Sequence, residues 1–207
     1  RILTDRVSDL LFCPSQTSFD LLASEGISNN SKHFIENVGD IMMDAALHFK
    51  TIGKNVHLPI KSNSKFILAT LHRAENTDNP ENLRAIVSAL NQIHLETEIV
   101  MPIHPRTKDI LNREGIEVKF TLIDPVGYIE MCRLLDLTTL VITDSGGLQK
   151  EAYYFKKKCI TMRENTEWTE LELTIKSGQM IEVYVDGEFK ISKYSFEKKG
   201  QEKSVNF

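Results

Sequence analysis

The sequence has few cysteines, no long apolar run and no evident leader, and each absence excludes a class of protein. Its three cysteines, Cys13, Cys132 and Cys159, are odd in number and far apart, which suits neither a disulfide framework nor a zinc cluster. We therefore expect buried free thiols in a reducing compartment. No apolar run approaches the ~20 residues that span a bilayer, and no signal peptide is evident. We expect a cytoplasmic protein without a membrane partner.

Neither positive nor negative charge is concentrated in one part of the sequence. The 25 Lys and Arg residues against 29 Asp and Glu residues give a net charge of -4, and the longest basic run is 156–158. A duplex-binding protein usually presents a basic face, so we do not expect nucleic acid as the partner. The hydrophobic share of 41% and the charged share of 26% are those of a globular chain, which excludes a disordered or fibrous one.

The common nucleotide and hydrolase motifs are also absent. The sequence contains no G-x-x-x-x-G-K-[ST] and no G-x-G-x-x-G, which excludes a P-loop and a standard dinucleotide fingerprint. It has no His-Glu-x-x-His and no serine in G-x-S-x-G. We therefore predict no metal site and no cofactor.

Strand-like and helical segments alternate along the chain. Strands are predicted at 9–13, 33–38, 66–71, 98–103, 118–123, 139–143, 158–162 and 180–185. Helices are predicted at 15–24, 40–49, 80–93, 105–113, 128–135, 146–155 and 167–175, with a loop at 51–64 and a surface tail from 186. Such alternation predicts right-handed βαβ units, and so an α/β fold with a parallel sheet and helices on both faces.

Local signals fix several helix boundaries. Asp40 and Asn79 are typical N-cap residues, and Pro80 suits the first helical position. Gly26 and Gly115 follow the predicted ends of two helices, where glycine is the usual C-terminal residue.

Polar clusters follow four of the predicted strands, at the sheet edge where α/β proteins bind ligands. They include His72 and Arg73, then His104, then the Ser145-Gly146-Gly147 run, and finally Arg163. Arginine and histidine donate to phosphate oxygens, and a helix that begins with glycines admits an anion close to its backbone. Glu151, further along the same helix, could accept from ribose hydroxyls. The clusters together predict a phosphate-binding edge.

Each cluster also has a purely structural interpretation. The Ser-Gly-Gly run can be an N-cap with a turn, and His72 an ordinary loop histidine. Arg73 with Glu75 can be a weak surface ion pair, and His104 with Pro105 a strand terminator. The hypothesis rests on the coincidence of four clusters at one edge.

With these clusters in view, the sequence resembles the UDP-N-acetylglucosamine 2-epimerase family. Two runs are specific together: His-Arg-Ala-Glu-Asn at 72–76 and Thr-Asp-Ser-Gly-Gly-Leu-Gln-Lys-Glu-Ala at 143–152. Further matching stretches, in the family's order, lie at 1–5, 25–27, 37–40, 103–105 and 162–168.

The resemblance implies a fold, a reaction and partners. Members have two Rossmann-like domains that face each other across a cleft, as in B-type glycosyltransferases. They interconvert UDP-GlcNAc and UDP-ManNAc by elimination and re-addition of UDP, for cell-envelope polysaccharides, and a related branch hydrolyses the intermediate. The resemblance implies no cofactor, a UDP-sugar substrate and a homodimer when the protein is full length.

Family roles carry over to matching positions. His72 matches a histidine that matters for activity near the diphosphate, so we predict a catalytic role. The predicted UDP contacts are Arg73, His104, Ser145, Gly146, Gly147, Glu151 and Arg163. Two positions depart from the family: Cys159 stands where proline is usual, and Met131 where some members have an aromatic residue near the uracil.

The resemblance also implies that the chain is a piece of a longer protein, since it begins with Arg1 and matches the family's C-terminal half. Residues 1–32 are predicted to be the trailing strand and helix of the N-terminal domain, and 33–207 the UDP-binding domain. The carboxylates that act on the C2 proton belong to the partner N-terminal domain, so we expect this chain to be inactive alone. A UDP-sugar glycosyltransferase domain and a non-catalytic nucleotide-binding module are the alternatives.

Overall fold

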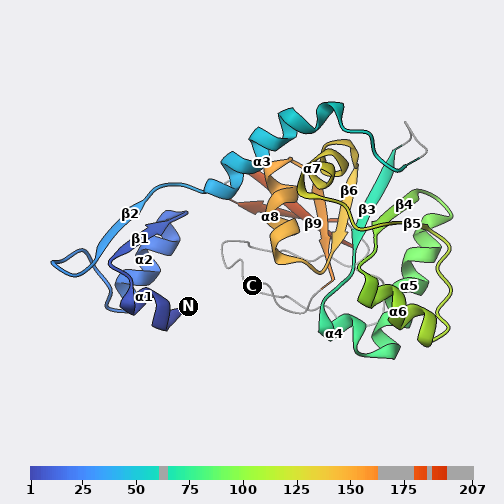
Figure 1. Cartoon of the computed structure of the whole chain (residues 1–207), viewed down its shortest axis with the longest axis horizontal. Helices are drawn as coiled ribbons and strands as arrows, with labels where there is room; N and C mark the ends of the chain where they lie inside the picture. The colour runs from blue at the N-terminus through green and yellow to red at the C-terminus, as the bar shows by residue number, and fades with distance from the viewer. Residues whose placement is uncertain (61–64, 163–179, 186–187, 195–207) are drawn as a thin grey trace. The chain divides into compact units, whose positions relative to one another are not determined.

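The computed structural model describes residues 1–60, 65–162, 180–185 and 188–194 (Figure 1). The chain divides into two compact units, Arg1–His48 and Phe49–Phe207, which we describe separately. Arg163 and the helix predicted at 167–175 lie outside the described residues.

The first unit is a small parallel βαβ arrangement. Helix α1 (Ile2–Val7) leads into β1 (Leu10–Cys13), and α2 (Gln16–Ser24) connects β1 to β2 (Phe34–Asn37). The two strands pair in parallel. Their inner side chains form a core with α2, made of Leu11, Cys13, Leu22, Ile27 and Ile35.

The other face of this two-stranded sheet is apolar and open. Leu10 and Phe12 are each 61% exposed, and Phe34 is 50% exposed. Strand β2 pairs with β1 from Leu10–Phe34 to Cys13–Asn37, so it belongs to the first unit. The two compact units meet in the sequence after residue 48, and the domain boundary after residue 32 stays a prediction from the sequence.

The capping signals predicted at Gly26 and Asp40 are confirmed. Gly26 follows α2 with a φ of +79°, the left-handed conformation that glycine adopts freely, and at the start of the same helix Ser15, which was not singled out, accepts from the backbone N–H of Ser18. The side chain of Asp40 accepts from the N–H of Met42 at 3.0 Å, where α3 (Ile41–Ile52) begins.

The loop predicted at 51–64 is wrong at its start. Helix α3 continues to Ile52, and the short 3-10 helix η1 (Gly53–Asn55) follows. At Gly53 a Cβ atom would lie 3.2 Å from the carbonyl oxygen of Ile129. The glycine therefore permits close approach between η1 and helix α7 (Tyr128–Leu137).

The second unit contains a five-stranded parallel sheet in the order β5-β4-β3-β6-β7. Its strands are β3 (Phe66–Thr70), β4 (Glu98–Pro102), β5 (Thr121–Ile123), β6 (Leu140–Thr143) and β7 (Lys158–Thr161). Every pairing is parallel, which confirms the predicted α/β class. The strand predicted at 118–123 is shorter in the structure, since β5 begins only at Thr121.

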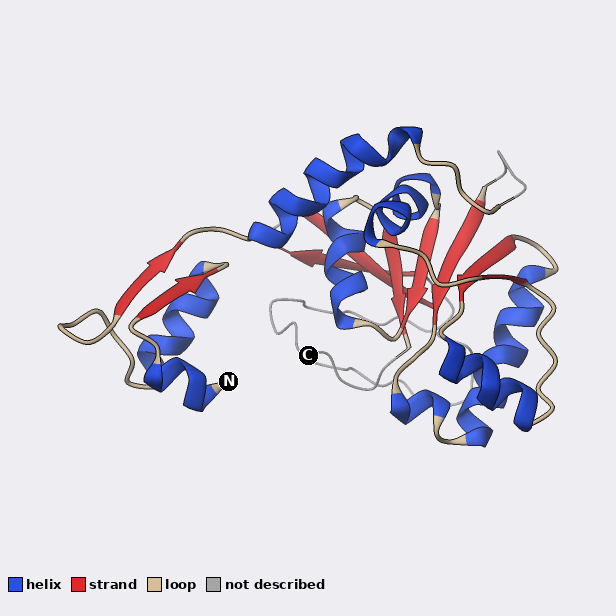
Figure 2. Cartoon of the chain, viewed as in Figure 1, coloured by secondary structure: helices blue, strands red, loops and turns tan. Residues whose placement is uncertain are grey.

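Helices cover both faces of this sheet (Figure 2). Besides α7 they are α4 (Ala74–Thr77), α5 (Pro80–His94), α6 (Pro105–Arg113) and α8 (Gly146–Tyr154). Leu83 of α5 and Ile110 of α6 pack in one core with Ile67 and Ile99 from one face of the sheet. Leu68 and Val141, which are also fully buried, alternate with that set and so face the side of α7 and α8.

The start of α5 shows how the sequence fixes a helix. Asn79 accepts from the N–H groups of Glu81 and Asn82 at 3.0 and 3.3 Å, and Pro80 occupies the first turn. Both features were predicted. All three cysteines are buried free thiols, also as predicted.

Beyond the sheet, β8 (Met180–Val185) pairs antiparallel with β9 (Glu188–Tyr194). The strand predicted at 180–185 is confirmed, but the predicted surface tail contains strand β9, which was not predicted. No helix in the described ranges is long and apolar enough to cross a membrane.

We expect Leu83→Ala to lower the free energy of unfolding by about 2–5 kcal/mol, because Leu83 is fully buried and its loss leaves a cavity. The matched control is Leu95→Ala, since Leu95 is 81% exposed and should cost under about 0.5 kcal/mol. Urea unfolding followed by circular dichroism measures both. Equal midpoints for the two variants would contradict the assignment of the core.

Candidate functional site

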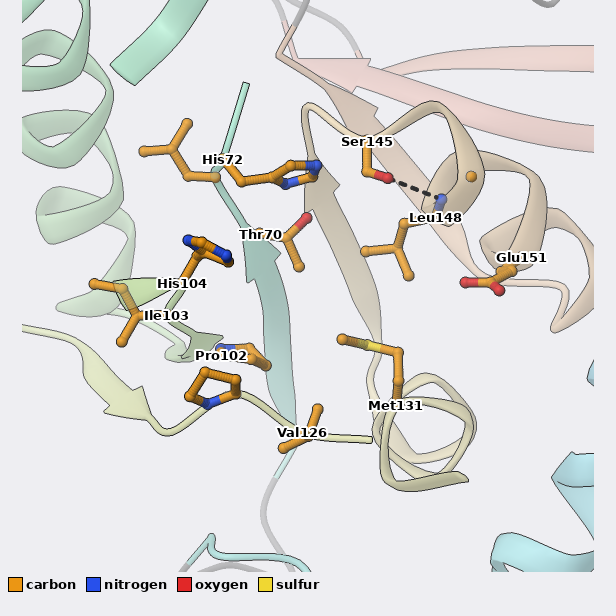
Figure 3. A pocket seen from close by; sticks show the side chains of 13 residues that line it. Thr70, His72, Pro102, Ile103, His104, Val126, Met131, Ser145, Leu148 and Glu151 are labelled. Atoms are coloured by element: carbon orange, nitrogen blue, oxygen red, sulfur yellow. Dashed lines mark hydrogen bonds between the residues drawn. The ribbon is translucent and has the colours of Figure 1, made fainter. Parts of the chain in front are cut away.

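A pocket of about 400 Å³ opens at the carboxyl ends of the sheet strands (Figure 3). It is lined by Thr70, Leu71, His72, Pro102, Ile103, His104, Pro125, Val126, Met131, Ser145, Gly147, Leu148 and Glu151. Strands β3 and β6 are neighbours, but the chain proceeds from β3 to β4 on one side and from β6 to β7 on the other. This reversal of strand order is where open α/β sheets bind ligands.

The structure gathers most of the residues singled out in the sequence. His72, His104, Ser145, Gly147 and Glu151 line the pocket. Gly146 is buried at the start of α8, and it and Arg73 are not among the lining residues. Arg163 lies beyond the described residues.

Ser145 caps α8 at the pocket wall. Its Oγ accepts from the backbone N–H of Leu148 at 3.4 Å, and its own N–H donates to Oγ1 of Thr143 at 2.9 Å. The first turn of a helix carries the positive end of the helix dipole. The start of α8 therefore favours an anion in the pocket.

His104 caps α6 on the opposite wall. Its Nδ1 accepts from the backbone N–H of Arg106 at 3.3 Å. A ring nitrogen that accepts carries no proton, so a neutral His104 holds its proton on Nε2. The ring thus has an N–H donor available on its other edge.

Asp144 lies between β6 and α8, beside the pocket residue Ser145, and it is fully buried. Its Oδ2 accepts from the backbone N–H groups of His72 and Arg73 at 3.0 and 2.8 Å, and from Nδ2 of Asn76 at 3.3 Å. Its Oδ1 lies 3.2 Å from Nδ1 of His72. Asp144 was not singled out in the sequence, although it directly follows the buried strand β6.

Asp144 and His72 change each other's pKa. Burial acts to raise the pKa of Asp144, but hydrogen bonds from the His72 ring and from the backbone of Arg73 and His72 outweigh it and lower that pKa. The hydrogen bond to Asp144 raises the pKa of His72 above its ordinary value, while partial burial and Arg73 oppose this. The pair therefore favours a carboxylate beside an imidazolium.

Glu151 lies on α8 and reaches the pocket from the side of α7. Burial raises its pKa, and a hydrogen bond with Tyr128 opposes the shift. Burial, together with Glu151, raises the pKa of Tyr128. The ring of Tyr128 also packs edge-on against Phe49, with centroids 5.4 Å apart. Tyr128 was not singled out in the sequence, because only the fold brings it to Glu151.

The pocket has a polar part and an apolar part (Figure 3). His72, Ser145 and Glu151 lie on the polar part, whereas Pro102, Val126 and Met131 lie on the apolar part. Such a pocket suits a ligand with an anionic group at one end and a flat, weakly polar group at the other.

The doubly wound sheet with its pocket at the reversal of strand order defines a Rossmann-like domain of the B-type glycosyltransferase architecture. The family profile described as UDP-N-acetylglucosamine 2-epimerase matches residues 1–183, and the chain belongs to this family.

Curated relatives and solved structures agree with this membership. The chain is 51% identical over 172 residues to the UDP-2,3-diacetamido-2,3-dideoxy-D-glucuronate 2-epimerase of Pseudomonas aeruginosa, covering 83% of this chain and 48% of that protein. It is 40% identical over 195 residues to the UDP-N-acetylglucosamine 2-epimerase of Methanocaldococcus jannaschii, covering 87% of this chain and 52% of that protein.

The crystal structure of the Methanocaldococcus jannaschii UDP-GlcNAc 2-epimerase in complex with UDP-GlcNAc and UDP matches with a TM-score of 0.69 and 38% identity, over 82% of this chain and 49% of that one. The Neisseria meningitidis enzyme bound to UDP-GlcNAc matches with a TM-score of 0.65 and 28% identity, over 81% and 48%. The chain thus spans about half the length of the relatives it matches.

We expect His72→Gln to destabilise the fold more at pH 6 than at pH 9. Because the folded-state pKa of His72 is raised, the ion pair contributes fully below the unfolded pKa and is lost as pH rises through the folded pKa. The effect should stay under about 1 kcal/mol, since the imidazole is 48% exposed and the pair is screened. Urea unfolding at several pH values measures it, and a cost that does not vary with pH would contradict the assignment.

Proposed function

We propose that this chain is the UDP-binding half of a UDP-GlcNAc 2-epimerase. The observation that carries the proposal is the pocket, in which a helix start and two histidines meet an apolar patch at the reversal of strand order. The family supports it, because solved members are in complex with UDP or UDP-GlcNAc.

In this proposal each part of the pocket takes one part of UDP. The start of α8, with Ser145, Gly146 and Gly147, receives the diphosphate, and His72 and His104 donate to its oxygens. Glu151 accepts from the ribose hydroxyls. The apolar patch with Met131 receives the uracil, and Met131 supplies contact area without aromatic stacking.

Arg73 and Arg163 complete the proposed set through the family resemblance. Arg73 adds positive charge next to His72, which is consistent with its effect on the pKa of that histidine. The assignment of Arg163 rests on the matching sequence alone.

The proposed chemistry explains why these groups are cationic or donors. Elimination of UDP from the sugar leaves negative charge on the departing diphosphate, and preorganised donors stabilise such developing charge. His72, near the diphosphate, is the proposed catalytic residue. Proton chemistry at C2 of the sugar requires the carboxylates of the N-terminal domain, so this chain alone binds UDP and catalyses nothing.

The names of the relatives bear on the substrate. One is named for a UDP-diacetamido glucuronate and another for UDP-N-acetylglucosamine, and both names describe a 2-epimerase of a UDP-linked acetamido sugar. We propose a substrate of that class, UDP-GlcNAc being the family's own, for use in cell-envelope polysaccharides. The proposed partners are the N-terminal domain of the same protein and a second copy in a cytoplasmic homodimer.

UDP titrated into the 207-residue chain should bind at least about tenfold more tightly than uridine, a difference of ~1.4 kcal/mol. The reason is that the diphosphate meets the helix start and the histidines, which uridine cannot reach. Isothermal titration calorimetry measures both affinities. Equal affinities would contradict the proposal, as would conversion of UDP-GlcNAc by this chain alone.

We expect Gly147→Ala to leave the fold intact and to weaken UDP binding about tenfold, or ~1.4 kcal/mol. A Cβ there would meet only Oγ of Ser145, at 3.9 Å, and alanine is favoured over glycine within a helix by about 0.5–1 kcal/mol. The methyl group would nevertheless stand where a phosphate approaches the backbone. Thermal unfolding checks stability and calorimetry checks affinity, and UDP affinity equal to that of the wild type would exclude this approach.

A further inference from the structure

The carboxylate of Asp144 has one oxygen occupied by three donors and the other aimed at a histidine. Oδ2 accepts from two backbone N–H groups and from Nδ2 of Asn76. Oδ1 is completely shielded from solvent and has no other partner in the described part of the chain than Nδ1 of His72, at 3.2 Å. A buried carboxylate oxygen is costly to leave without a donor, so this oxygen requires a proton on Nδ1.

This requirement decides which nitrogen of His72 titrates. An ionised carboxylate can only accept, so Nδ1 keeps its proton in both charge states of the ring. The proton that comes and goes is therefore on Nε2. The side chain of His72 is 48% exposed and lines the pocket, and Figure 3 shows its ring among the pocket side chains, near Ser145.

The geometry points to Asp144 as the positioning residue of the site: it holds the Nδ1 proton of His72, so that Nε2 carries the exchangeable proton at the place proposed for the diphosphate. This inference rests on the proposed function, since it deepens the role of His72. When His72 is charged, Nε2–H donates to an anion. When it is neutral, Nε2 presents a lone pair to the same anion and repels it.

The second histidine of the pocket is held in the opposite way. His104 accepts a backbone N–H at Nδ1, so its neutral ring keeps a proton on Nε2. His104 is therefore a donor without needing charge, whereas His72 is a donor only when charged. Each tautomer follows from the partner of Nδ1, a carboxylate for His72 and an N–H for His104.

Asn76 makes Asp144 rigid. Its Nδ2 donates both to Asp144 and to the carbonyl oxygen of Met162, at 3.3 and 3.0 Å. Asp144 follows β6, the two backbone donors follow β3, and Met162 follows β7. The carboxylate is thus fixed at the ends of three adjacent strands, and it can hold the imidazole in one orientation.

The charges that act on His72 come from few groups. Asp144 favours the imidazolium and Arg73 disfavours it. The other titratable side chains that line the pocket are His104, at the start of α6, and Glu151, on α8. Of these groups, only Asp144 is within 4 Å as an opposite charge. Removal of its charge should therefore dominate any change in the titration of His72.

Nitrogen-15 NMR of the histidine rings tests the inference directly, with His72→Gln to assign the signals of His72. We expect neutral wild-type His72 to carry its proton on Nδ1, and His72 in Asp144→Asn to titrate about one pH unit lower. A proton on Nε2 in the neutral wild-type ring would overturn the inference. This measurement needs no variant of Asp144, so it decides the matter even where Asp144→Asn fails to fold.

UDP affinity against pH separates positioning from a merely structural role. Asp144→Asn should bind UDP as wild type does at pH 5.5 and up to about tenfold more weakly above pH 8, because a one-unit shift changes the imidazolium population tenfold. In the His72→Gln background the same substitution should cause no pH-dependent difference in UDP affinity, and Asp109→Asn, on the exposed side of α6, is the matched control. An affinity loss equal at all pH values would overturn the inference. Absence of UDP binding to the wild type would instead overturn the proposed function, while the NMR result on the tautomer would stand.

Discussion

One buried carboxylate holds the edge of the sheet together. Asp144 is shielded from water, yet its pKa is lowered, because donors from the segment after β3 surround it. Burial without those donors would favour the neutral acid and loosen every bond it makes. The loop after β3 donates to this group directly, and Asn76 connects it to the carbonyl of Met162, which follows β7. The negative charge of Asp144, which acts on His72 in the pocket, is thus stabilised by the same hydrogen bonds that hold the edge of the sheet.

The sequence predicted best what local chemistry decides. Helix starts at Asp40 and Asn79 and the helix end at Gly26 depend on residues within one turn, so their signals are readable in a single sequence. The polar clusters after β3, β4 and β6 were also predicted, because strand ends of one parallel sheet share an edge. Five of the eight predicted site residues line the pocket.

What the sequence missed depends on contacts between distant segments. The bonds from Asp144 to His72 join residues 72 positions apart, and Tyr128 reaches Glu151 only because α7 and α8 lie on one face of the sheet. The pairing of β1 with β2 joins residues more than 20 positions apart, which no local pattern reveals. Strand β9 is an exception, because Asp186-Gly187 precedes it and Phe189 and Ile191 alternate with polar residues, a local hairpin signal that the prediction of a surface tail overlooked.

The pairing of β3 with β6 has a consequence for how the pocket comes into existence. These strands align from Ile67–Leu140 to Thr70–Thr143, and all that lies between them, including β4, β5 and their helices, must be looped out before they meet. Closing so long a loop carries an entropy cost, which the folded contacts must offset. Until the two strands pair, the carboxylate after β6 has none of its donors from the segment after β3. A ligand that contacts both segments therefore binds only chains in which β3 and β6 are paired. Because it binds the folded chain and not the unfolded one, it raises the free energy of unfolding.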